Sequence, residues 1–109
     1  MLPKKERITK ETFLSIMKNG KILSSPLFIF RYLTINNKEY SPKYAFVAPK
    51  TVAKQAVLRN KLRRQGYNAL KQYKQLPCVM GIFFYKKGSG KASFKEIKDS
   101  TKTILSKIS

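Results

Sequence analysis

The stretch AVLRNKLRRQGYNAL, from Ala56 to Leu70, is the most informative part of this sequence. Its apolar residues recur at near-helical spacing, yet five of the six side chains from Arg59 to Arg64 are polar or cationic. On a helix, the apolar positions collect on one arc and most of the polar positions on the opposite side. The sequence therefore predicts a helix that packs one stripe on a core and presents a basic face outward. The apolar arc holds Leu58, Leu62, Gly66, Ala69, Leu70 and Tyr73, and the opposite side holds Lys54, Asn60, Lys61, Arg64, Asn68 and Lys71.

The charge of the whole chain supports a functional role for this face. There are 24 Lys and Arg against 5 Asp and Glu, a net charge of +19, and no acid between Glu39 and Glu96. A helix that only needed solubility would normally pair Glu with Lys one turn apart, whereas here like charges such as Arg59 and Arg63 repel. We therefore favour contact with the phosphates of a polyanion over a merely solvated face. Asn60 adds neutral hydrogen-bonding capacity that suits sugars or bases.

The composition restricts the classes of protein to which this chain can belong. The 109 residues, of which 42% are hydrophobic, predict one globular domain spanning 1–109. No stretch reaches the roughly 18 apolar residues of a membrane span, and the first ten residues lack the apolar core of a signal peptide, so we expect a cytoplasmic protein. The chain has no histidine and a single cysteine, Cys78, in an apolar run. We predict a buried thiol and no zinc site.

Three helices are predicted. The first runs from Thr9, a plausible N-cap, to Asn19, and Gly20 closes it. The long basic helix is predicted from Thr51 to Lys74. In the last helix, Ser93 and Glu96 form the pattern of a capping box.

Strands are predicted where β-branched and aromatic residues concentrate. The first two, 27–35 and 43–48, are separated by Asn36-Asn37 and are expected to pair as a hairpin. The third, 78–85, is almost wholly apolar, which is typical of a central strand buried on both faces. The predicted fold class is α+β, a single sheet of about four strands with helices packed on it, in the order helix, strands, helix, strand, helix.

The segment APKTVAKQAVLRNKLRR, residues 48–64, resembles the signature of the bacterial ribonuclease P protein component. In that family a strand leads into a helix with an Arg-Asn-Arg-like core. RITKETFLSIMKNGK resembles the family's first helix, SPLFIFRYL and YAFVAPK its first strands, VMGIFFYKKG its later strand and SFKEIKDSTKTIL its last helix. The resemblance covers nearly the whole chain. It implies a ribosomal protein S5 domain 2-like fold with an unusual left-handed βαβ crossover.

The resemblance also implies a function. The chain would be the RNA-binding protein subunit of ribonuclease P, an endonuclease that removes the 5′ leader of precursor tRNA. Its partners would be the catalytic RNA subunit and precursor tRNA, with no membrane and no further protein required. Mg²⁺ would be held mainly by the RNA subunit and the substrate, and no residue of this chain would be catalytic.

Two groups of residues match the family's binding sites. The resemblance assigns contact with the RNA subunit to the signature helix and its approach, and contact with the leader to a cleft between the first helix and the sheet. Alternation along the first strand puts Phe28, Phe30 and Tyr32 on one face and Ile29 and Arg31 on the other. The RNA-binding group is Lys50, Lys54, Arg59, Asn60, Lys61, Arg63 and Arg64, and the leader cleft is Phe13, Met17, Ile29 and Arg31.

Several positions depart from the family pattern. Met17 replaces a common aromatic residue and Arg31 a common Tyr, which predicts less stacking and more phosphate attraction in the cleft. Thr51 and Tyr67 stand where basic residues are usual, and Pro49 replaces a usual Ser. The basic face is therefore expected to be shorter than is typical.

Two other functional classes are open at this stage. A ribosomal or general RNA-binding protein would share the charge and the architecture but would need no leader cleft. An autonomous nuclease would need clustered carboxylates to hold metal ions. The five acids, Glu6, Glu11, Glu39, Glu96 and Asp99, form no such cluster in the sequence and are better explained as helix-capping and surface charges.

Overall fold

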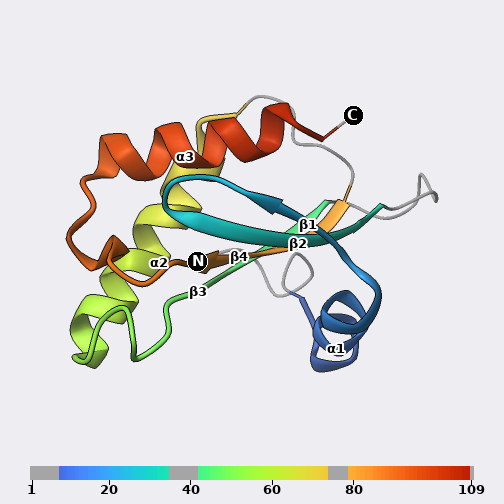
Figure 1. Ribbon diagram of the computed structural model, residues 1–109, viewed down its shortest axis with the longest axis horizontal. Coiled ribbons are helices and arrows are strands. Elements are labelled where there is room, and N and C mark those ends of the chain that lie inside the picture. Colours follow the sequence, from blue (N-terminus) through green and yellow to red (C-terminus); the bar gives the residue numbers. More distant parts are fainter. Residues whose placement is uncertain (1–7, 35–41, 74–78, 109) are drawn as a thin grey trace.

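The computed structural model describes residues 8–34, 42–73 and 79–108. Within these ranges three α-helices surround one sheet (Figure 1). The Asn36-Asn37 turn, Cys78 and the predicted helix end at Lys74 lie outside the described residues. In chain order the elements are α1 Lys10–Asn19, β1 Lys21–Ser24, β2 Phe28–Thr34, β3 Lys43–Val47, α2 Ala56–Lys71, β4 Val79–Tyr85, the 3-10 turn η2 Ser89–Lys91 and α3 Phe94–Ser106.

The sheet has four strands in the order β1-β2-β4-β3. β4 pairs antiparallel with β2 and parallel with β3, so Phe83 lies opposite Phe30 on one side and Phe46 on the other. The expected hairpin between the strands at 27–35 and 43–48 is therefore wrong, because β4 lies between them. The prediction of a central position for the apolar strand is confirmed. The fourth strand of the predicted sheet, to which the sequence pattern gave no position, is β1, a short antiparallel edge strand beside β2.

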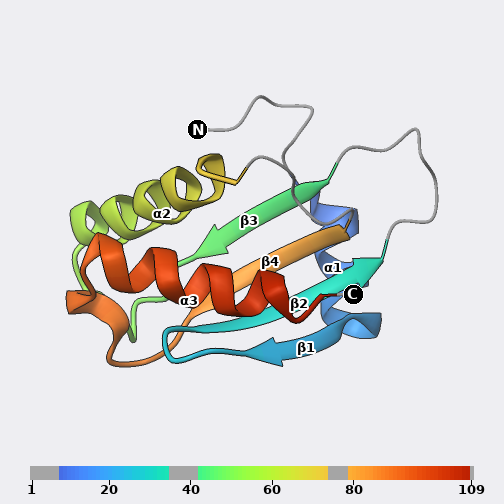
Figure 2. The same ribbon diagram turned by 90° about the horizontal axis from the view of Figure 1, so that it is seen from above.

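The connection from β3 through α2 to β4 is left-handed. α2 packs against β3 and α3, on the face of the sheet opposite α1. Figure 2 looks onto the face that α3 covers, with β3 and β4 pointing the same way. Seen with the strands pointing upward, β4 lies to the left of β3, which is the reverse of the usual right-handed crossover. The fold implied by the family resemblance is thus confirmed.

The core lies between the sheet and the pair α2 and α3. Alternation along β2 buries Phe28, Phe30 and Tyr32, as predicted, and leaves Ile29 and Arg31 on the other face. The Phe83 ring lies at the centre of this layer, with ring centroids 4.3 Å from Phe30 and 4.7 Å from Phe46. The second face of the sheet is covered only in part, by α1.

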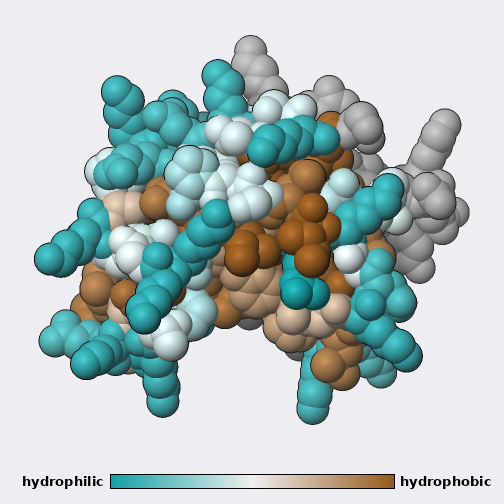
Figure 3. Space-filling view, in the orientation of Figure 1, coloured by the Kyte–Doolittle hydropathy of each residue, from teal (hydrophilic) through white to brown (hydrophobic). Residues whose placement is uncertain are grey.

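The helix caps explain where α1 and α3 begin. The Thr9 hydroxyl accepts a hydrogen bond from the Thr12 N–H, and the reciprocal capping box of Ser93 and Glu96 is present. Both predictions are confirmed. In Figure 3, hydrophilic side chains project along much of the outline of the molecule, and a hydrophobic area lies near the centre of the view.

The basic helix is shorter than predicted. α2 begins at Ala56, not at Thr51, because the segment before it forms a turn in which the N–H groups of Val52 and Ala53 donate to the Pro49 carbonyl. Lys54 therefore lies on this turn and not on the helix. The other end of α2 is at Lys71.

Gly66 in the middle of α2 has a packing reason. A Cβ at this position would lie 2.4 Å from Cδ1 of Phe46, whose ring lies directly under the helix. Only a residue without a side chain lets α2 approach β3 this closely. The contact with Phe46 thus accounts for a glycine in the middle of this helix.

Candidate nucleic-acid interface

The outward face of α2 is cationic and exposed. Lys61, Arg63 and Arg64 are all exposed, and the helix contains no acidic residue. Gln55 at the N-cap makes no side-chain capping bond. The positive end of the helix dipole is thus left without a compensating acid. This face therefore carries a concentrated positive potential.

The turn before α2 extends this potential. Lys50 and Lys54 are exposed on it, so the sequence-predicted basic residues from 50 to 64 form one continuous stretch of turn and helix. Lys50 and Lys54 lie on the turn, whereas the basic residues from Arg59 to Arg64 lie on the helix. Only the helical residues therefore have the regular spacing of an α-helix.

Arg59 differs from the other cations of the predicted group. It is half-buried, and its Nη1 donates to the main-chain oxygens of Ala53 at 3.1 Å and Lys54 at 2.8 Å. Charge-assisted hydrogen bonds of this kind are stronger than neutral ones. Arg59 therefore fixes the turn that carries Lys54, in addition to contributing positive charge.

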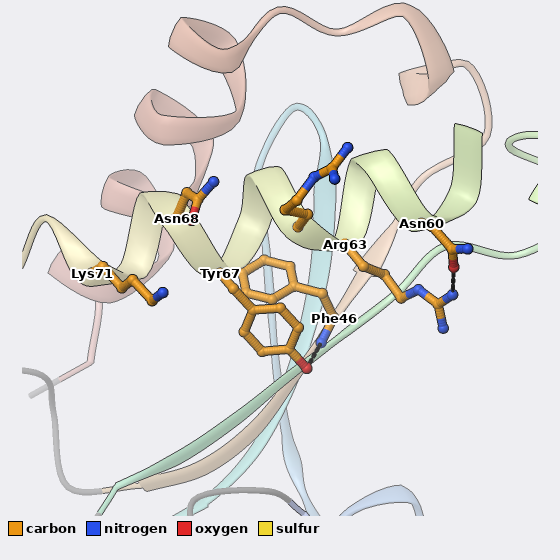
Figure 4. A pocket seen from close by; sticks show the side chains of 7 residues that line it. Phe46, Asn60, Arg63, Tyr67, Asn68 and Lys71 are labelled. Carbon is orange, nitrogen blue, oxygen red and sulfur yellow. Dashed lines mark hydrogen bonds between the residues drawn. The ribbon is translucent and has the colours of Figure 1, made fainter. Parts of the chain in front are cut away.

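Beside this face lies a hollow of about 510 Å³ between α2 and the edge of β3. In Figure 4, Tyr67 lies over Phe46, and Asn60, Arg63, Asn68 and Lys71 follow along the helix. The Arg63 guanidinium donates a hydrogen bond to Oδ1 of Asn60. The lining residues are Phe46, Asn60, Arg63, Arg64, Tyr67, Asn68 and Lys71.

The second predicted site lies where α1 crosses the sheet. Nη1 of Arg31 donates to the main-chain oxygen of Met17 at 3.2 Å, which joins β2 to the last turn of α1. The Phe13 ring packs edge-on against Phe84, with centroids 6.4 Å apart. Ile29 lies opposite Phe84 in the register of β2 and β4. The structure thus brings together the four residues predicted for the cleft.

This face of the sheet is more open than predicted and includes residues that the sequence reasoning missed. The side chains of Met80 and Phe84 are only half-buried, so β4 is not fully buried on both faces. Register places Ala45 and Val47 of β3 on the same face, and both are half-buried. The uniformly apolar run of β4 contains no alternation of polar and apolar residues that could have identified Phe84, and the run was interpreted as buried throughout.

The junction between α1 and β1 is tight. The Gly20 N–H donates to the Ile16 carbonyl at 2.8 Å, and a Cβ on Gly20 would lie 2.4 Å from the same oxygen. Together with the Arg31 contact, this junction holds α1 at a defined position across the sheet.

Among residues 8–34, 42–73 and 79–108, no three His, Cys, Asp or Glu side chains lie close enough to hold a metal ion. Within the same ranges, none of the helices combines the length and the hydropathy required to cross a bilayer.

Three comparisons with known proteins bear on the family of this chain. The comparison with curated proteins gave no significant match. The structure is similar to the RNase P protein from Thermotoga maritima, with a TM-score of 0.82 and 20% identity, covering 95% of this chain and 98% of that one. It is also similar to two structures of the Staphylococcus aureus RNase P protein. One has a TM-score of 0.80 and 23% identity and covers 93% of each chain. The other has a TM-score of 0.75 and 26% identity and covers 97% of this chain and 92% of that one.

The sequence itself decides membership, because structural similarity at such low identity shows the fold alone. The model of the Ribonuclease P family matches residues 2–109, almost the whole chain. This match agrees with the order of motifs described above and with the left-handed crossover. The chain belongs to the ribonuclease P protein family.

Proposed function

We propose that this chain is the RNA-binding protein subunit of a ribonuclease P ribonucleoprotein and assists its catalytic RNA in removing the 5′ leader of precursor tRNA. The observation that carries the proposal is the acid-free basic surface of α2 and its preceding turn, in a chain of this family. Exposed Lys61, Arg63 and Arg64 can each neutralise a phosphate and release counterions, so that affinity accumulates along the helix. This surface is the proposed contact with the RNA subunit.

The proposed contact with the leader is the cleft between α1 and the sheet. Its half-buried Phe13 and Phe84 offer aromatic surface to bases, while Arg31 supplies the positive charge for a phosphate. Every nucleotide of single-stranded RNA has a base that can stack and a phosphate that carries charge, whereas mature tRNA has no leader to bind at this site. The cleft would therefore favour precursor over mature tRNA.

The chemistry of the reaction is proposed to lie on the RNA. Hydrolysis of a phosphodiester by metal-ion catalysis requires metal ligands placed beside the scissile bond. Among the described residues no three His, Cys, Asp or Glu side chains form a group that could ligate a metal ion. We propose that the RNA subunit and the substrate hold these ions, and that this chain binds and orients RNA in the cytoplasm.

Binding to the RNA subunit tests the proposal. The purified chain would be titrated against its cognate RNA subunit, an unrelated structured RNA and a ribosomal RNA fragment over a salt series. We expect preferential binding to the RNA subunit, and a variant with Lys61, Arg63 and Arg64 all changed to Gln should bind more weakly with a shallower salt slope. The matched control replaces Lys95, Lys98 and Lys102 of α3 with Gln, which removes the same charge elsewhere. Equal affinity for all RNAs would favour a general RNA-binding protein instead.

A further inference from the structure

The hollow beside α2 has a chemical character that phosphate binding alone does not explain. Its centre is the half-buried aromatic ring of Tyr67, at a position where a further cation would extend the basic face. Arg63, Arg64 and Lys71 lie around this ring, and Asn60 and Asn68 add two carboxamides (Figure 4). Unlike the surrounding cations, the electronegative face of an aromatic ring does not attract a phosphate.

The ring of Tyr67 is fixed in orientation by the sheet. Its hydroxyl accepts a hydrogen bond from the Phe46 N–H at 3.4 Å. The two rings meet edge to face, with centroids 5.1 Å apart and an interplanar angle of 75°. Phe46 is itself stacked on Phe83 in the core, 4.7 Å between centroids. Because folding has already ordered this ring, a ligand that stacks on it does not bear that entropic cost.

The groups around the ring are suited to the rest of a nucleotide. A base offers a π-face to an aromatic side chain, and its edges offer donors and acceptors that a carboxamide can match. The phosphates on either side of the base carry the charge that the arginines and Lys71 attract. Arg63 is held by Asn60 at one end of the hollow, and Lys71 lies at the other end. A volume of about 510 Å³ lies within the range of small-ligand sites.

We infer that this hollow is a binding site for one unpaired nucleotide of the RNA subunit, with the base stacked on Tyr67 and the flanking phosphates on Arg63, Arg64 and Lys71. This inference rests on the proposed function, because it takes the RNA subunit as the occupant. It adds to that function a stacking contact that recognises a base extruded from a helix, so that α2 distinguishes an RNA with an unpaired nucleotide at this point from a regular duplex.

Affinity for the RNA subunit, measured over a salt series, separates stacking from charge. Tyr67→Leu keeps the apolar bulk but removes the ring, and it should weaken binding about tenfold at every salt concentration, leaving the slope unchanged. Arg63→Gln should instead make the slope shallower by about one phosphate contact. Tyr67→Trp retains a stacking ring while losing the hydroxyl. It should therefore bind the RNA subunit more tightly than Tyr67→Leu, with an affinity close to that of the natural chain.

The matched control is Tyr73→Leu, the same change on a half-buried tyrosine beyond the end of α2 and outside the hollow. It should leave the affinity within about twofold of that of the natural chain. Thermal unfolding of each variant confirms that binding is measured on folded protein. Chemical probing of the RNA should show one unpaired base that the natural chain and Tyr67→Trp protect and Tyr67→Leu does not.

The outcomes distinguish this inference from the proposed function. Unchanged affinity of folded Tyr67→Leu, an equal loss in Tyr73→Leu, or failure of Tyr67→Trp to restore binding would overturn the nucleotide site while leaving α2 as an RNA-binding helix. Failure of the natural chain to bind its RNA subunit would overturn the proposed function itself.

Discussion

The guanidinium of Arg31 donates a hydrogen bond to the main-chain oxygen of Met17, with 3.2 Å between Nη1 and the oxygen. Met17 lies in the last turn of α1, where carbonyl groups have no partner within the helix and where a positive charge is favourable. Arg31 thus fixes the position of α1 across the sheet. A guanidinium has five donors, so the same side chain keeps donors for a ligand at the proposed leader site.

Replacement of Arg31 tests its role in the proposed leader cleft. Arg31→Tyr removes the charge and the contact with Met17, so it should lower the affinity of the reconstituted holoenzyme for precursor tRNA but not for mature tRNA. The salt dependence of precursor binding should become shallower by about one phosphate contact. Arg31→Lys, which keeps the charge, is the control for the slope. An equal loss for both tRNA forms would place Arg31 outside the leader path.

Arg59 and Arg63 should respond differently although they lie one turn apart. Arg59→Ala removes two hydrogen bonds to the Ala53 and Lys54 carbonyls and should reduce the free energy of unfolding by about 1–2 kcal/mol. Arg63→Ala, on the exposed face, should change it by less than about 0.5 kcal/mol while weakening RNA binding. Urea unfolding and RNA titration of both variants provide the measurement. An equal free energy of unfolding for the two variants would contradict the role of Arg59 in holding the turn before α2.

Gly66→Ala tests the close approach of α2 to the sheet. Alanine favours a helix over glycine by up to about 1 kcal/mol, but its Cβ would lie 2.4 Å from the Phe46 ring. We expect the overpacking to dominate and to lower the free energy of unfolding by about 1–3 kcal/mol in urea. Asn68→Ala, on the exposed side of the same helix, is the control and should have little effect on stability. A stabilised Gly66→Ala variant would show that the Phe46 ring can move aside at little cost in free energy.

The capping box of α3 predicts a dependence of stability on pH. The Glu96 carboxylate accepts the Ser93 N–H at 3.1 Å, and the hydrogen bonds with Ser93 hold the pKa of Glu96 below its ordinary value of 4.5. A group whose pKa is lowered on folding stabilises the protein above its unfolded pKa, and this contribution is lost as the pH falls through the folded pKa. Glu96→Gln should therefore melt at a lower temperature than the natural chain at neutral pH. This difference in melting temperature should become smaller as the pH falls through the pKa of Glu96. A difference that stayed the same at all pH values would show that another interaction is responsible.

The sequence predicted the local structure of the chain better than its long-range pairing. Thr9 and the Ser93–Glu96 box mark helix starts because capping depends on a few adjacent residues. The placement of β4 between β2 and β3 depends on partners far apart in the chain, which a turn signal between 35 and 43 cannot reveal. The start of α2 was placed too early because helical spacing alone does not reveal that the segment after Pro49 folds into a separate turn, which Arg59 holds by hydrogen bonds to its carbonyl groups.

For the candidate sites too, the local sequence pattern was predictive and the contacts between distant residues were not. Alternation identified Ile29 and Arg31 as a face distinct from Phe28 and Phe30, and the structure confirms it. It could not show that Arg31 contacts Met17, or that Tyr67 is held by the edge of β3. Phe84 was missed because the uniform apolar composition of β4 conceals which of its faces is open.

Reconstituted cleavage of precursor tRNA tests the central claim most directly. The chain, its cognate RNA subunit and the two together would be assayed at limiting Mg²⁺ for release of the 5′ leader. The account predicts no cleavage by the chain alone and faster cleavage by the mixture than by the RNA alone, with most of the gain lost when Lys61, Arg63 and Arg64 are changed to Gln. Robust cleavage by the RNA-free chain, or no stimulation of the RNA subunit by folded protein, would contradict it.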